Sequence, residues 1–111
     1  MLTIENLKAF GANTEEGVVR CVNNESFYLT MVGKAISDAN FEKLEQAIQT
    51  NDLDAGFEAA HALKGILGNL SLTPILEPVQ EITELLRARS EADYDALLQE
   101  ILTKKSELES L

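Results

Sequence analysis

The stretch AAHALKGILGNL, residues 59–70, combines a helical repeat of apolar side chains with the only histidine of the chain. Successive residues of an α-helix are about 100° apart around its axis. With His61 set at zero, Leu63 and Leu67 lie at about 200° and about 240° on that wheel. The leucines therefore define a buried face, and His61 lies almost opposite to it. This placement favours an exposed histidine over one that is satisfied inside a core.

Two glycines, a lysine and an aromatic residue share the exposed face with His61. On the same wheel Lys64, Gly65 and Gly68 lie at about 300°, about 40° and about 340°. Glycine in a helix lowers stability by roughly 0.5–1 kcal/mol relative to alanine, so two glycines beside one histidine need a reason. Their missing side chains leave the imidazole accessible and let another surface approach. Phe57, at about 320°, is either a contact for that surface or a core residue at the edge of the stripe.

The combination of His61 and Lys64 suits phosphoryl transfer. Histidine is partly neutral near neutral pH and can act as a nucleophile through one ring nitrogen. A phosphoryl group bound there carries negative charge on its oxygens, and a lysine one helical turn away can offset that charge. Each residue alone has a plainer interpretation, namely an inert surface histidine and a solvated lysine.

The sequence on both sides of this stretch also has helical spacing. No strand pattern competes with the apolar stripes over a useful length. The stripes are Tyr28, Met31, Val32, Ala35 and Ile36; Phe41, Leu44 and Ile48; Ile75, Val79, Ile82 and Leu86; and Tyr94, Leu97, Leu98, Ile101 and Leu102. Amphipathic helices bury such stripes against one another. The sequence therefore predicts an all-α fold, an antiparallel four-helix bundle with additional short N-terminal helices, in a single domain over residues 1–111.

Cap residues and prolines suggest where these helices begin and end. The predicted caps are Gly11, Asn13, Asn51, Asp52, and Ser90 together with Asp93. Pro74 suits a first helical turn, whereas Pro78 would remove a backbone donor inside a helix. The segment around Pro78 is therefore expected either to begin near Glu77 or to have a kinked first turn.

Composition narrows the classes of function. The net charge of −10 and the scattered basic residues argue against nucleic-acid binding and against an anionic membrane surface. No apolar run approaches the roughly 18–20 residues of a membrane span, and the first residues lack the apolar run expected of a secretory signal. The single cysteine, Cys21, suits a reducing cytoplasm. The acidic excess either attracts a basic partner or is only a solvated surface.

The motif AHALKGILGNL resembles the signature of histidine-containing phosphotransfer (HPt) domains of bacterial and plant phosphorelays. The resemblance covers residues 59–70 at the level of residues, and most of the chain at the level of helix order. It implies a four-helix bundle with the active histidine exposed on its second core helix. It also implies that His61 is phosphorylated, that Lys64 steadies the phosphoryl group and that Gly65 keeps the site open, whereas Gly68 occupies a less strict position.

The chain departs from the family pattern just after the motif. Family members commonly have a glycine where this chain has Ser71, and a small residue where it has Leu72. These departures concern the next connector and leave the histidine, the lysine and the first glycine untouched. A polar residue of the following helix often lies near the histidine in this family, and either Gln80 or Thr83 could take that place.

The resemblance predicts a phosphorelay intermediate. His61 would accept a phosphoryl group from an aspartyl-phosphate receiver domain and pass it to another receiver, with Phe57, Gly65 and Gly68 in the docking surface. The chain has no nucleotide-binding loop, so it is expected to have no kinase site and no bound cofactor. Mg²⁺ is expected on the receiver. The expected partners are response-regulator receivers and a hybrid histidine kinase, with the chain itself a cytoplasmic monomer.

Two other classes of function compete with phosphotransfer. A helical adaptor could use the same surface to bind a partner, with His61 incidental. A metal or hydrolytic enzyme is disfavoured because there is one histidine, no His-x-x-x-His spacing and no sequence feature that marks a nucleophilic serine.

Overall fold

Seven α-helices and no strand make up the fold in a computed structural model that describes all 111 residues. The helices are α1 (Ile4–Phe10), α2 (Thr14–Arg20), α3 (Glu25–Ile36), α4 (Asn40–Gln49), α5 (Leu53–Asn69), α6 (Thr73–Arg87) and α7 (Tyr94–Glu109). The all-α prediction is confirmed.

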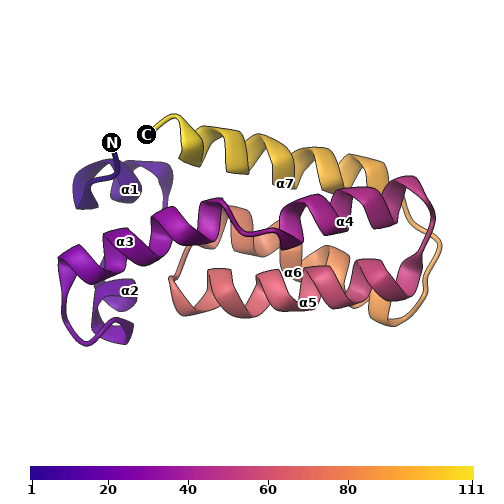
Figure 1. Ribbon diagram of the computed structural model, residues 1–111, viewed down its shortest axis with the longest axis horizontal. Coiled ribbons are helices and arrows are strands. Elements are labelled where there is room, and N and C mark those ends of the chain that lie inside the picture. The colour runs from indigo at the N-terminus through magenta and orange to yellow at the C-terminus, as the bar shows by residue number, and fades with distance from the viewer.

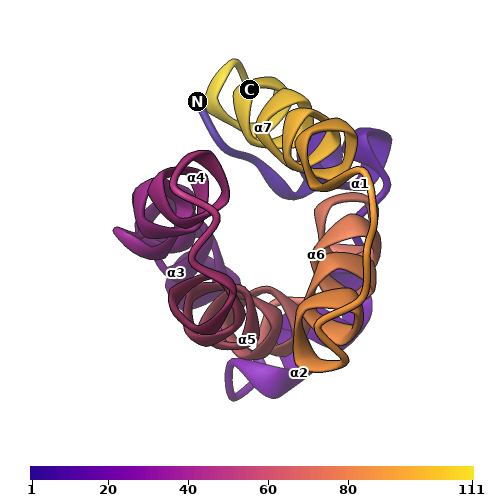
Figure 2. The same cartoon turned by 90° about the vertical axis from the view of Figure 1, so that its right-hand side faces the viewer.

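The four C-terminal helices surround a common centre (Figure 2). Helix α5 packs against both α4 and α6, while α7 packs against α6 and also touches α4. Each of the four runs opposite to the one before it, with short connectors at the ends (Figure 1). This arrangement is compatible with the antiparallel four-helix bundle expected from the sequence. The short helices α1 and α2 lie at one end, next to α3.

The core is built from the stripes that the sequence predicts. On α5 the buried residues are Gly56, Ala59, Ala60, Leu63 and Leu67. Burying a leucine stabilises a fold by about 1.5–3 kcal/mol, so the apolar side of α5 fixes how this helix is rotated. Because that rotation is fixed, the opposite side of α5 must face solvent.

Helix α6 begins earlier than one of the sequence alternatives proposed. It starts at Thr73 and runs without interruption through Pro78 to Arg87, so a helix that begins near Glu77 is wrong. Pro78 has no amide hydrogen for the carbonyl one turn back, which removes one helical hydrogen bond. Its ring is buried, and this apolar contact offsets part of the loss.

Caps confirm most of the predicted boundaries. Gly11 ends α1 with φ of 112°, and Asp52 begins α5 by accepting a hydrogen bond from the Ala55 amide at 3.1 Å. Asp93 alone caps α7, where its side chain accepts from the Ala96 amide. The expectation that Ser90 shares this role is wrong, because the helix begins at the residue after Asp93.

Tyr28 joins α3 to the end of α5. Its side chain is fully buried, and its hydroxyl donates a hydrogen bond of 2.9 Å to the Leu70 carbonyl. Burial raises the pKa of Tyr28 to about 12 from 10.0, and the neighbouring Cys21 adds to the shift. The folded chain therefore keeps the phenol proton at a pH where the unfolded chain has lost it.

Stability is expected to fall at alkaline pH through Tyr28. The contribution is fully present below about pH 10 and is lost as the pH rises towards about 12, a change of roughly 2–3 kcal/mol. Urea unfolding across this range measures it. For Tyr28→Phe, the free energy of unfolding should fall less steeply with pH between about 10 and 12 than for the natural chain. The lysines and the other tyrosine titrate equally in both chains. An identical slope would contradict the burial of this phenol.

Candidate functional site

His61 lies in the middle of α5 with its side chain exposed, and no hydrogen bond within the chain holds its ring. The buried neighbours Ala60 and Leu63 turn their side chains to the core, which leaves the imidazole on the outer face. The predicted exposure of His61 is confirmed. A ring nitrogen on this face is free to react with a group from another molecule.

Phe57 supports the imidazole from one turn earlier. Its ring stacks on His61 with the ring centroids 5.4 Å apart and an angle of 21° between the planes. The Arg87 guanidinium carbon lies 5.0 Å from the Phe57 centroid. Phe57 is itself half-buried and packs against the core. The core-edge interpretation of Phe57 is therefore confirmed, and the ring also limits how the imidazole can turn, whereas its contact with a docked surface stays a prediction.

Lys64 is partly exposed and engaged with α6. Its side chain is 34% exposed, and its Nζ lies 3.8 Å from Glu84 Oε1. The other carboxylate oxygen of Glu84 accepts from Arg87 Nε at 2.9 Å. Exposed ion pairs of this kind contribute only about 0–1 kcal/mol. Lys64 can therefore exchange Glu84 for a stronger anion at small cost.

The two glycines of the His61 face are not required by packing inside the chain. A Cβ atom added at Gly65 would meet nothing within 4 Å, and one added at Gly68 would lie 3.9 Å from Leu76 Cδ1, an ordinary contact. Alanine would fit at both positions and would favour the helix. The space in front of Gly65 is thus open to a partner.

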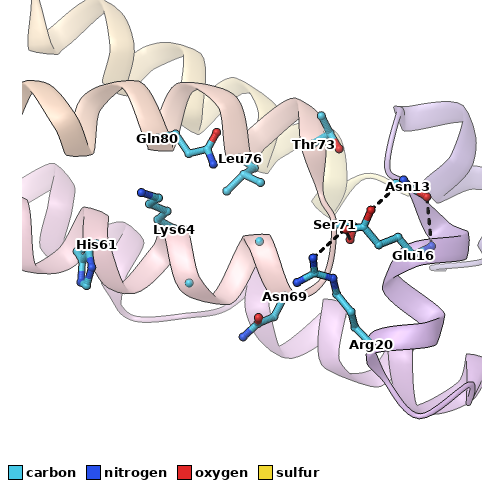
Figure 3. Close-up of a pocket in the computed structure, with 12 residues that line it drawn as sticks. Asn13, Glu16, Arg20, His61, Lys64, Asn69, Ser71, Thr73, Leu76 and Gln80 are labelled. Carbon is cyan, nitrogen blue, oxygen red and sulfur yellow. Dashed lines mark hydrogen bonds and ion pairs between the residues drawn. The ribbon is translucent and has the colours of Figure 1, made fainter.

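A polar groove with a volume of about 470 Å³ lies along this face (Figure 3). Its lining includes Glu16 and Arg20 from α2, His61, Lys64, Gly65 and Gly68 from α5, and Gln80 from α6. His61 lies at one end of the groove and Arg20 at the other, while Lys64 and Gln80 face each other across it. Sequence reasoning missed the contribution of α2, because nothing in the pattern of residues 14–20 indicates a contact with the distant helix α5.

The Hpt domain family model matches residues 35–111 of the chain. The chain belongs to the Hpt domain family. This confirms the resemblance that the motif suggested. Hpt domains are phosphotransfer modules rather than kinases, and they interact with the receiver domains and kinases of two-component systems. No curated protein and no solved structure matches the chain.

The geometry separates the two polar candidates on α6 of this Hpt domain. Thr83 is fully buried, and its hydroxyl donates to the Val79 carbonyl at 2.6 Å. Gln80 is exposed and lines the groove opposite Lys64. Since a buried and already bonded hydroxyl cannot reach the solvent face, Gln80 is the α6 residue that stands near the site.

In this Hpt domain, Ser71 stands in the α5–α6 connector where family members commonly have a glycine. Its φ is 54°, in the left-handed region that glycine adopts most easily. Its hydroxyl donates to Glu16 Oε1 at 3.0 Å, and its carbonyl accepts from the Asn13 amide at 2.9 Å. The following Leu72 is fully buried in the core. The connector therefore keeps the conformation of a glycine, and the serine adds one side-chain bond, to Glu16, beside the backbone bond that any residue here would make.

Two further properties of the Hpt chain complete the site description. No group of three or more His, Cys, Asp or Glu side chains is placed to hold a metal ion. None of the helices combines the length and the apolar character that crossing a membrane requires.

Proposed function

We propose that the chain is a phosphorelay intermediate that carries a phosphoryl group on His61. The observation that supports this best is an exposed imidazole without internal hydrogen bonds, next to Lys64 and the open space at Gly65, in a chain of the Hpt family. The donor is the aspartyl phosphate of a receiver domain, and the acceptor is the aspartate of a second receiver. The whole of residues 1–111 acts as one monomeric unit.

The transfer is a displacement at phosphorus. A ring nitrogen of His61 donates its lone pair to the phosphorus atom, the bond between phosphorus and the aspartate oxygen breaks, and the carboxylate leaves with its electron pair. The second ring nitrogen keeps its proton. The reverse sequence loads the next receiver. The Mg²⁺ that this chemistry uses belongs to the receiver's acidic residues, and this chain contributes no nucleotide site.

Side chains around His61 have distinct parts in this reaction. Lys64 leaves its weak pair with Glu84 and offsets the negative charge of the transferring phosphoryl group. The Gln80 amide, on the far side of the groove, donates a hydrogen bond to a phosphoryl oxygen. The stacked ring of Phe57 keeps the imidazole from swinging, which lowers the entropy lost when the reacting atoms are aligned.

A labelling experiment tests the proposal. The purified chain is incubated with a series of receiver domains that carry radioactive aspartyl phosphate and Mg²⁺, and label on the chain is followed in acid and in alkali. We expect label that acid removes and alkali does not, as for a phosphoramidate. Binding of receivers without any label on the chain would instead support the adaptor.

Gly65→Ala is expected to separate stability from transfer. The added methyl group meets no atom of the chain, so the variant should be as stable as the natural chain or more stable by about 0.5–1 kcal/mol. The methyl group intrudes on the docked receiver, and a misfit of about 1–3 kcal/mol would slow transfer roughly 5- to 150-fold. Initial transfer rates and thermal unfolding measure the two effects.

Gly33→Ala is the matched control for Gly65→Ala. Gly33 also lies within a helix, and its added Cβ would meet only Leu2 Cδ1, at 3.9 Å. It should match the natural chain in transfer. A large loss of thermal stability in Gly65→Ala, together with normal transfer, would mean that this glycine serves packing rather than docking.

A further inference from the structure

The groove continues well past the reacting histidine. Gly68 lies two helical turns beyond His61 on the same face, which is about 10 Å along α5. With Gly65 and Gly68 as its floor, the groove reaches α2, where Arg20 closes the far end (Figure 3). Arg20 and His61 thus lie at opposite ends of the groove, so Arg20 is placed to contact the body of a docked partner rather than the phosphoryl group.

Helix α2 is held firmly in place at that end. The Asn13 amide and the Glu16 carboxylate both bond to Ser71, at 2.9 and 3.0 Å. Tyr28, which packs close to Gly17, bonds to the carbonyl before Ser71. A helix fixed by these contacts presents its side chains at defined positions, as a specific docking surface requires.

The Arg20 guanidinium has N–H donors that make no contact within the chain. Its only ion pair is with Glu16, with Nη2 and Oε1 3.0 Å apart, and its side chain is 50% exposed. A guanidinium carries five N–H donors, so most of them remain free for a second carboxylate. In Figure 3 the guanidinium lies over the end of the groove rather than away from it.

The charge of the groove differs from that of the molecule. The chain has a net charge of −10, yet the lining of the groove holds two cations, Arg20 and Lys64, against one carboxylate, Glu16, with Glu84 beside Lys64 just outside the lining. An acidic partner surface is therefore repelled less here than over most of the molecule. Such a difference in charge orients the partner as it approaches the groove more than it adds to the affinity of the complex.

We propose that Arg20 is a second docking contact that binds an exposed Asp or Glu of the same receiver domain that exchanges phosphate with His61. This rests on the proposed function and adds a residue that selects the receiver. Helix α2 precedes residues 35–111, the part that the family model matches, so the contact belongs to a segment of this chain outside the family match.

Charge reversal at Arg20 tests the proposal against a matched control. The probe is the receiver domain that labels the natural chain fastest, or binds it most tightly if none labels it. Arg20→Glu should raise the dissociation constant for that receiver about tenfold or more, and Arg20→Lys should recover most of the binding. Arg89→Glu is the control, because Arg89 is also exposed, at 61%, and also forms one ion pair, with Asp54, but lies outside the groove.

Two measurements keep the inference separate from the proposed function. Isothermal titration reports docking whether or not phosphate moves, and labelling of His61 by phosphoramidate reports the histidine without a receiver. Normal phosphoramidate labelling of Arg20→Glu with weakened receiver binding supports the inference. Equal binding by Arg20→Glu and Arg89→Glu overturns it and leaves the proposed function standing. Failure of the natural chain to accept label from any donor overturns the proposed function alone, because the titration still measures the contact.

Discussion

His61→Gln is expected to abolish labelling by phosphorylated receivers while the chain folds normally. Glutamine keeps a polar side chain on the exposed face but has no nucleophilic nitrogen, and removing a nucleophile lowers activity by several orders of magnitude. The imidazole makes no hydrogen bond within the chain and loses only its stack on Phe57. Stability should therefore stay within about 0.5 kcal/mol of the natural chain.

The measurement for His61→Gln combines transfer with docking. Initial rates of label transfer and the dissociation constant for the same receiver are determined for both chains. We expect no label on the variant and a dissociation constant changed by less than about threefold, since the groove beyond the histidine is intact. Equal labelling of the variant would show that another residue accepts the phosphoryl group and would end the assignment of His61.

The helical wheel of residues 59–70 predicted the exposed histidine because the same repeat gives the rotation of the helix and the direction of the His61 side chain. The leucines fix which way α5 is rotated, and the rotation fixes which way His61 points. Lys64, Gly65 and Gly68 follow from the same geometry. A local periodic pattern is enough here, since the site lies mainly on a single helix.

Contacts between distant segments were beyond the reach of that pattern. Ser71 bonds to Glu16, 55 positions earlier, and no local repeat encodes such a pair. Thr83 lies one turn after Val79, so the stripe of α6 already places its side chain towards the core, but which α6 residue approaches His61 depends on how α6 packs against α5. The uninterrupted course of α6 through Pro78 likewise depends on burial of the proline ring in the core.

Gly17 shows a second use of glycine in the same fold, opposite to that of Gly65. At Gly65 an added Cβ enters empty space, whereas at Gly17 it would lie 2.8 Å from Tyr28 Cζ and 2.9 Å from the Leu70 carbonyl oxygen. The phenol ring cannot swing aside freely, because it is fully buried and its hydroxyl is bonded to that same carbonyl. The glycine is therefore required where α2 crosses Tyr28.

Gly17→Ala is expected to destabilise the chain by about 1–3 kcal/mol, the usual range for overpacking a buried contact. For a domain of this size the shift in melting temperature is about 5–20 °C. Calorimetry or urea unfolding measures it, and Gly33→Ala, with its single contact at 3.9 Å, serves as the control that carries only the helix propensity of alanine.

A double-mutant cycle identifies the cause of the Gly17→Ala effect. In a Tyr28→Ala background the added methyl group meets the Leu70 carbonyl but no ring, so its penalty should shrink by more than about 0.5 kcal/mol. The loss should also weaken receiver binding if Arg20 acts in docking, because the clash displaces the helix that presents it. A Gly17→Ala variant as stable as Gly33→Ala would mean that α2 does not pack against Tyr28. The placement of Arg20 at the end of the groove would then be wrong as well.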